Sequence, residues 1–107
     1  MALHEVNKQN FQKEVLEHKG LVFVDFHAEW CGPCKVTSPI IEGLAAEMPD
    51  IKFVAVDVDQ NPELASQYSV FSIPTFLILK DGQVASQFVG AMGKERFVDE
   101  INKVKAA

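Results

Sequence analysis

The chain contains two cysteines, Cys31 and Cys34, within the sequence WCGPCK. They follow an apolar run, Leu21–His27, that is typical of a buried strand. If a helix begins near Cys34, then Cys31 lies at its N-terminus, where unpaired amide groups and the helix dipole favour a thiolate over a thiol. A thiolate is the attacking species in thiol–disulfide exchange, and the second cysteine is close enough to resolve the mixed disulfide. The spacing therefore predicts redox chemistry.

A structural disulfide and a zinc site are two other uses of such a pair. A disulfide across so short a spacer closes a very small loop, so it restricts the unfolded chain little. Zinc needs about four ligands, usually including a second Cys or His pair. The histidines, His4, His18 and His27, show no paired spacing. Both alternatives are therefore weaker than the redox interpretation, and no metal site is expected.

Composition is that of a compact globular protein. The chain has 107 residues, 48% of them hydrophobic, and a formal net charge of −5. These values predict one domain over residues 1–107 and give no electrostatic basis for nucleic-acid binding. No apolar stretch approaches the roughly 18 residues that span a bilayer, and the first residues lack the features of a secretory signal. We therefore expect a cytoplasmic protein without a membrane segment, where a Cys-x-x-Cys pair is more often catalytic than structural.

Helix and strand patterns alternate along the chain. Apolar periodicity and capping residues predict helices over residues 7–20, 34–48 and 61–68 and a last one that begins near Gly93. Apolar runs predict strands over 21–27, 51–58, 75–80 and 84–89, the last two joined by a hairpin turn at Asp81-Gly82. This order predicts an α/β fold, with a central mixed sheet of four to five strands and helices on both faces. The cysteines follow the C-terminal end of a strand, where function gathers in such sheets.

Five segments carry a resemblance to a known family: VDF at 24–26, AEWCGPCK at 28–35, DVDQNP at 57–62, IPTF at 73–76 and VGA at 89–91. In order and spacing they resemble the thioredoxin family, over essentially the whole chain. The resemblance implies the thioredoxin fold and a monomeric protein disulfide reductase, recharged by an NADPH-dependent thioredoxin reductase. Cys31 would attack substrate disulfides and Cys34 would resolve them, with no cofactor beyond their own disulfide. The Gly-Pro spacer is the reductase-like version of the motif.

Asp25 lies inside the apolar strand before the cysteines. Burial makes an ionised carboxylate costly, so its pKa should rise. Such a carboxyl group behind Cys34 could take and return the proton of that thiol during resolution. The alternative is an ordinary carboxylate at a hydrated strand edge.

Pro74 follows Ile73 and resembles the family's cis-proline. A cis bond beside the disulfide would leave the Ile73 backbone free to pair with an extended substrate. Trp30 is expected to form a docking surface for substrate proteins rather than plain core. The other residues expected on this surface are Gly32, Pro33, Gly90 and Ala91.

Three residues depart from the family pattern. His27, Ala55 and Ser72 stand where relatives usually have an aromatic residue, a lysine and a glycine. Without a lysine at Ala55, desolvation should dominate the pKa of Asp25, and His27, on the same face of the strand, can perturb it. Two other functions stay open at this point: a partner-binding subunit that needs no turnover, and an oxidant or isomerase.

Overall fold

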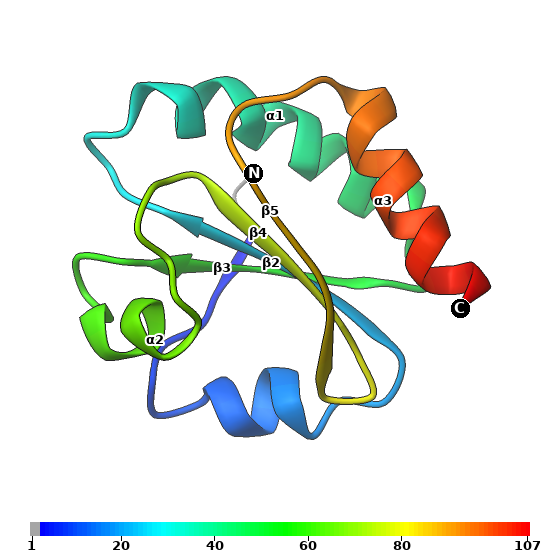
Figure 1. Ribbon diagram of the computed structural model, residues 1–107, viewed down its shortest axis with the longest axis horizontal. Helices are drawn as coiled ribbons and strands as arrows, with labels where there is room; N and C mark the ends of the chain where they lie inside the picture. The colour runs from blue at the N-terminus through cyan, green and yellow to red at the C-terminus, as the bar shows by residue number, and fades with distance from the viewer. Residues whose placement is uncertain (1–2) are drawn as a thin grey trace.

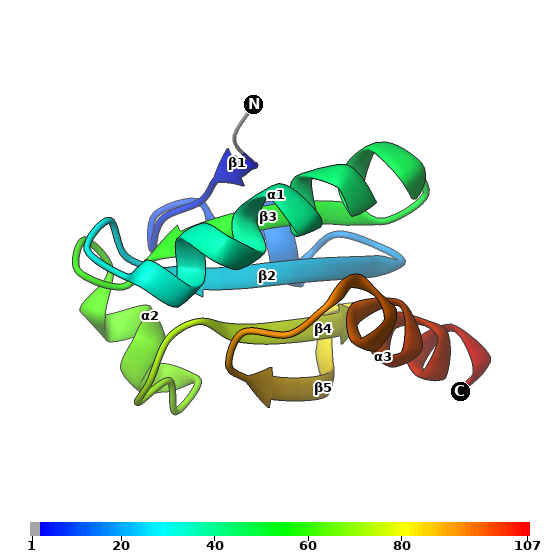
Figure 2. The ribbon, with the colours of Figure 1, turned by 90° about the horizontal axis from the view of Figure 1, so that it is seen from above.

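The computed structural model describes residues 3–107. They contain a mixed five-stranded sheet in the order β1-β3-β2-β4-β5 (Figures 1 and 2). The strands are β1 (His4–Glu5), β2 (Leu21–His27), β3 (Lys52–Asp57), β4 (Thr75–Lys80) and β5 (Gln83–Val89). The central strand β2 runs parallel to β3 and antiparallel to β4. The predicted mixed sheet is confirmed, with β1 as an additional edge strand that the sequence pattern did not indicate.

Helices cover both faces of this sheet, as predicted. α1 (Gly32–Glu47) and α3 (Lys94–Ala106) lie on one face, while α2 (Pro62–Gln67) and the π-helix η1 (Gln12–Leu16) lie on the other (Figures 1 and 2). α1 follows β2 after a short connection. The C-terminal end of the central strand therefore leads directly to the two cysteines.

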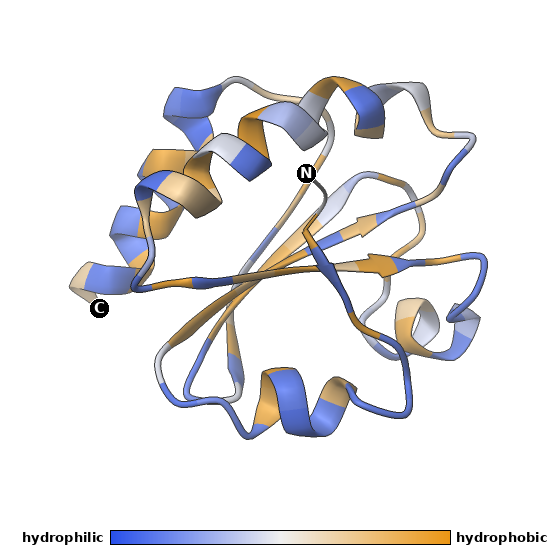
Figure 3. Cartoon of the chain, turned by 180° about the vertical axis from the view of Figure 1, so that it is seen from behind, coloured by the Kyte–Doolittle hydropathy of each residue, from blue (hydrophilic) through white to orange (hydrophobic). Residues whose placement is uncertain are grey.

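Alternation along β2 divides the core into two parts. Phe23 packs with residues of α1 and α3, whereas Val22 and Val24 pack with residues of η1 and α2. Figure 3 shows hydrophobic residues along the strands and a mixture of hydrophilic and hydrophobic residues along the helices. Because successive side chains of a strand point to opposite faces, Asp25 and His27 share with Phe23 the face that α1 covers.

The first helix is shorter than the sequence pattern predicts. Phe11 and Val15 are buried as expected, but η1 ends at Leu16 rather than at Gly20. Gly20 belongs instead to a junction with the hairpin. Its amide donates to Oδ1 of Asp81 at 2.8 Å, and its carbonyl accepts from the Asp81 amide at 3.0 Å. Gly20 is therefore held by long-range hydrogen bonds to Asp81 and does not end the helix, although the local pattern predicts that it does.

We expect Gly82→Ala to lower the free energy of unfolding by about 2 kcal/mol. Gly82 has a φ of +82°, a left-handed conformation, and a Cβ atom there would collide with the carbonyl oxygen of Leu16. Urea denaturation measures the change. Gly43→Ala is the matched control, because Gly43 lies inside α1 with open space around it, and alanine there should raise stability by about 1 kcal/mol. Equal stability of Gly82→Ala and wild type would contradict the prediction.

Candidate active site

Cys31 and Cys34 form a disulfide at the start of α1. Cys31 is the N-cap residue of the helix, and its Cα lies 5.3 Å from that of Cys34, inside the usual range for a disulfide. The Cys34 amide donates a hydrogen bond to Sγ of Cys31 at 3.2 Å. When the pair is reduced, this amide and the positive end of the helix dipole favour the thiolate form of Cys31.

The disulfide packs against the segment that precedes β4. Ile73 and Val58 contact the small cluster formed by Ala28 and the two cysteines. The bond between Ile73 and Pro74 is cis, and the Pro74 carbonyl accepts a hydrogen bond from the Gly90 amide at 2.9 Å. The fold thus brings together Ile73, Pro74 and Gly90 among the predicted docking residues. Gly32, Pro33 and Ala91 are exposed, and Trp30 lines a groove close by.

An apolar groove of about 360 Å³ lies beside the disulfide. Trp30 and Phe71 line it with side chains that are 69% and 88% exposed. The indole Nε1 of Trp30 donates to Oδ2 of Asp59 at 2.7 Å, which fixes the orientation of the ring. The other lining residues are Val58, Val70, Ser72 and Ile73. Sequence reasoning missed Phe71 as a surface residue of this site, because the local pattern does not distinguish an exposed aromatic residue from a core one.

Asp25 is 2% exposed, and its Oδ1 atom has no hydrogen-bond partner among residues 3–107. Burial raises the pKa of this carboxyl group to about 7, and the charge of Glu5 adds to the rise, while protonated His27 opposes it. The raised pKa predicted from the sequence is therefore confirmed, with desolvation as its first cause. The hydrated strand edge offered as an alternative is wrong, because the side chain lies inside the protein.

A cavity of about 130 Å³ opens onto Asp25 between the sheet and α1. Across the sheet, Glu5 and Asp25 both pair with Ala55, so the three side chains form a row on one face. The small side chain of Ala55 leaves space between the two carboxyl groups. Ser38 lines the cavity from α1. It lies one helical turn after Cys34, so both point from α1 toward the sheet side that carries Asp25.

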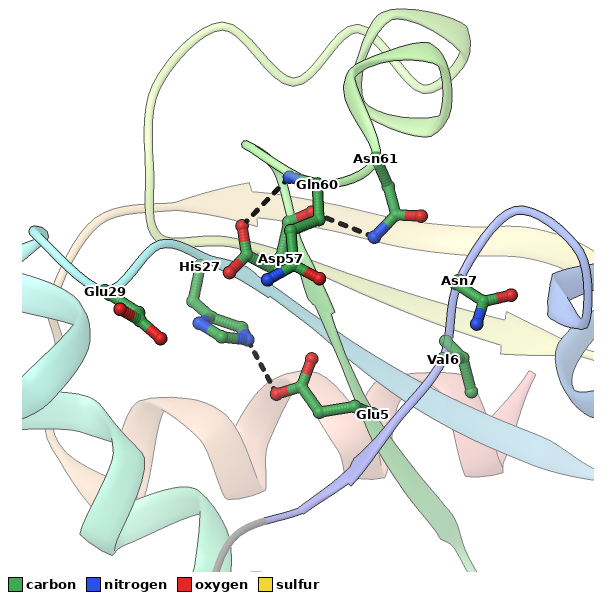
Figure 4. Close-up of a pocket in the computed structure, with 8 residues that line it drawn as sticks. All are labelled: Glu5, Val6, Asn7, His27, Glu29, Asp57, Gln60 and Asn61. Carbon is green, nitrogen blue, oxygen red and sulfur yellow. Dashed lines mark hydrogen bonds and ion pairs between the residues drawn. The ribbon is translucent and has the colours of Figure 1, made fainter.

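His27 closes the site on its outer side. Its Nε2 atom lies 2.9 Å from Oε2 of Glu5, and its side chain is 20% exposed. The hydrogen bond to Glu5 raises the pKa of His27, burial opposes the rise, and the charges of Glu5, Asp25 and Asp57 add to it. Figure 4 shows the imidazole ring directed toward Glu5 inside a second cavity of about 300 Å³.

Comparison with known proteins identifies the family. A family model described as Thioredoxin matches residues 2–103. The thioredoxin of Bacillus subtilis is 47% identical over 104 residues, which cover 96% of this chain and 98% of that protein. The thioredoxin of Chlamydia trachomatis is 45% identical over 98 residues, or 92% of this chain and 94% of that protein. The thioredoxin of Mycobacterium bovis is 43% identical over 104 residues, which cover 96% of this chain and 90% of that protein.

The chain belongs to the thioredoxin family. Together with the Cys31–Cys34 pair, this makes the protein a thiol–disulfide oxidoreductase that carries electrons as a dithiol or a disulfide. Among residues 3–107, no group of three or more His, Cys, Asp and Glu side chains is arranged to hold a metal ion. In the same part of the chain, no helix combines the length and the apolar character needed to cross a membrane.

The row formed by Glu5, Ala55 and Asp25 predicts how a lysine at position 55 would act in this protein. We expect Ala55→Lys to lower the pKa of Asp25 below its value of about 7, because an ammonium group between two carboxylates stabilises their charged forms. The titration of the labelled Asp25 carboxyl carbon, followed by NMR, measures this pKa. Ala55→Met is the control, because methionine fills similar space without a charge. An Asp25 pKa that is the same in both variants would contradict the prediction.

Proposed function

We propose that this protein reduces disulfide bonds in other proteins through the Cys31–Cys34 pair and is recharged by a thioredoxin reductase that uses NADPH. The observation that carries the proposal is the position of Cys31 as the N-cap of α1, with the Cys34 amide on its sulfur atom. A helix N-terminus favours the thiolate that begins disulfide exchange. Membership of the thioredoxin family supports the same function.

The reaction has two exchange steps. The thiolate of Cys31 attacks one sulfur of the substrate disulfide, expels the other as a thiolate and forms a mixed disulfide. Cys34 then attacks Sγ of Cys31, which breaks the bond to the substrate and closes the Cys31–Cys34 disulfide. Two electrons pass from the cysteine pair to the substrate, whose two released thiolates take protons from solvent.

Asp25 is the proposed base of the second step. Cys34 must lose a proton before it attacks, and a carboxylate with a pKa of about 7 is well matched to accept one near neutral pH. The side chain lies under the α1 face that carries Cys34 and Ser38. The protonated carboxyl group must then release this proton before it can act as a base in the next cycle.

Substrate proteins are proposed to dock beside the disulfide. Among residues 3–107, the backbone amide and carbonyl of Ile73 make no hydrogen bond, so an extended substrate segment can pair with them as an added strand. Trp30 and Phe71 offer exposed aromatic surface to apolar residues near the substrate cysteine. The proposed surface is completed by Gly32, Pro33, Pro74, Gly90 and Ala91.

The disulfide itself is the proposed electron carrier, so the protein is expected to need no bound cofactor. NADPH would be used only by the partner reductase. We further propose that the protein acts as a monomeric, single-domain enzyme in the cytoplasm, since its formal net charge of −5 favours solubility over association.

Reduction of insulin disulfides tests this function in two arms. Wild-type protein reduced with dithiothreitol should reduce insulin directly, and catalytic amounts should do so with NADPH and a bacterial thioredoxin reductase. The variant with both Cys31→Ser and Cys34→Ser should be inactive in both arms. Failure of the first arm would make a partner-binding role, without turnover, the better explanation. Failure of the second arm alone would overturn the proposed reductase partner.

A further inference from the structure

Two cavities of this protein meet at the same two residues. The smaller one, of about 130 Å³, opens onto the buried carboxyl group of Asp25, and the larger one, of about 300 Å³, is drawn in Figure 4. Glu5 and His27 line both cavities. The hydrogen-bonded pair of these side chains, Nε2 of His27 and Oε2 of Glu5 at 2.9 Å, therefore lies between the buried acid and the outer pocket.

We propose that His27, oriented by Glu5, carries the proton between Asp25 and solvent during the resolution step of this enzyme. The proposal rests on the function given above, in which Asp25 takes the proton of Cys34. His27 acts through Asp25 and does not touch the reacting sulfur atoms, so it is a positioning and relay residue. The role depends on the titratable imidazole ring, which a plain aromatic side chain at this position would lack.

Asp25 needs a relay because the protein isolates it. The carboxyl group is 2% exposed, and its Oδ1 atom lacks a hydrogen-bond partner among residues 3–107. A proton taken from Cys34 must leave before the next cycle, yet within residues 3–107 Oδ1 has no direct protein partner to receive it. The adjoining cavity is large enough for water. Water there would span the gap between Asp25 and the imidazole ring.

His27 has the chemistry that a relay requires. An imidazole ring has two nitrogens and can accept a proton on one while it releases a proton from the other. Nε2 is held by Glu5, and Nδ1 has no hydrogen-bond partner in the described chain. Burial brings the pKa of Asp25 to about 7, and the hydrogen bond to Glu5 raises that of His27. Both shifts favour the protonated form, so each of the two groups can hold the proton in turn.

Among residues 3–107, the charged side chains that line the two cavities around His27 are all acidic. They come from five different parts of the fold: Glu5 of β1, Asp25 of β2, Asp57 of β3, Glu42 of α1 and Glu29 of the segment before α1. Such surroundings favour the protonated ring. The ring can therefore hold a proton received from Asp25 until solvent in the outer pocket removes it.

The proton balance of the resolution step closes. Cys34 gives its proton to the Asp25 carboxylate as its sulfur bonds to Sγ of Cys31, and the substrate leaves as a thiolate. That thiolate takes a proton from solvent. Asp25 passes the acquired proton through cavity water to His27, and His27 releases a proton to solvent. No further oxidant or reductant is needed.

Stopped-flow reduction of an aromatic disulfide, whose thiolate absorbs visible light, separates the two exchange steps. Each step releases one coloured thiolate, so the first rate reports the attack by Cys31 and the second reports resolution by Cys34. We expect His27→Gln to slow the second step on the order of tenfold near neutral pH and to leave the first step unchanged. The pH midpoint of the second step should also rise, because a positive charge near Asp25 is lost.

Chemical rescue distinguishes a relay from a structural role. Added imidazole, at constant pH and ionic strength, should restore the second step in His27→Gln and leave wild type unaffected. His4→Gln is the matched control. His4 is an exposed histidine on β1, the strand that also carries Glu5, and its Nε2 atom lies 3.9 Å from Oε1 of Glu14. The His4→Gln variant should behave as wild type. Glu5→Gln keeps the imidazole ring of His27 but removes the carboxylate that orients it. This variant should slow the second step less than His27→Gln does, and it should lower the pKa of His27.

The variant Asp25→Asn distinguishes failure of the His27 relay from failure of Asp25 as the proposed base. If Asp25→Asn slows resolution and His27→Gln does not, the relay is wrong and the proposed base stands. If Asp25→Asn has no effect, the proposed base itself is wrong. If His27→Gln slows resolution without rescue by imidazole, or slows it further in the Asp25→Asn background, His27 is a structural residue and the relay is overturned.

Discussion

Cys31→Ser is expected to abolish disulfide reduction, whereas Cys34→Ser should attack a substrate once and remain bonded to it. The two cysteines differ in position: Cys31 caps α1 and receives the Cys34 amide on its sulfur, so the thiolate forms on Cys31. Activity of Cys31→Ser should fall to the background rate of the assay. Mass spectrometry should detect the mixed disulfide of Cys34→Ser with a substrate peptide.

Alkylation of the reduced wild-type protein is the independent check on these roles. Iodoacetamide at neutral pH should label Cys31 before Cys34, because only thiolates react quickly. Circular dichroism of both serine variants controls for loss of fold. Faster labelling of Cys34, or a stable mixed disulfide on Cys31→Ser, would reverse the assigned roles.

Asp25→Asn is expected to raise the free energy of unfolding by about 4 kcal/mol above neutral pH. The folded pKa of Asp25 is about 7, against an ordinary value of 3.8. Between these two values the folded state holds a proton that the unfolded state has lost. The stability of wild type therefore falls as pH rises from about 4 to about 7, and it levels off above that. Asparagine is neutral throughout, so its variant avoids this loss.

Denaturant unfolding of the oxidised proteins across this pH range measures the difference. The two stability curves should nearly coincide at the acid end and diverge steadily toward neutral pH. Asp99→Asn is the control, because Asp99 is an exposed acid on α3; its curve should stay parallel to that of wild type. Parallel curves for Asp25→Asn and wild type would show that Asp25 does not titrate there, and its role as a base would lose its foundation.

Much of the fold could be predicted from local sequence patterns, because tertiary packing agrees with the local preferences. The run Leu21–His27 is apolar because both faces of the central strand are covered. The turn at Asp81 and Gly82 forms because both residues adopt positive φ, as a tight hairpin requires. The cysteine pair was likewise predictable, since its spacing and its place after a strand define the chemistry.

Other parts of the site could not be predicted, because they depend on contacts between distant segments. β1 contains two residues, His4 and Glu5, too few for an alternating pattern, so its place beside β3 depends on the assembled sheet. The hydrogen bond between Glu5 and His27 could therefore not be predicted from the sequence. The exposure of Phe71 was hidden as well, because an apolar residue is assigned to the core unless its surroundings are known.

The short edge strand β1 changes how sequence variation in this protein should be interpreted. Substitutions near the start of a chain are commonly regarded as neutral, because terminal segments of most domains tolerate change. Here the acid that orients His27 lies at Glu5, and the Val6 amide that follows it is bonded to the Ala55 carbonyl at 2.8 Å. A change in this segment would reach the redox centre through the sheet while leaving the sequence around the cysteines intact. Variants of this kind belong with the active-site substitutions when natural or engineered forms of the protein are classified.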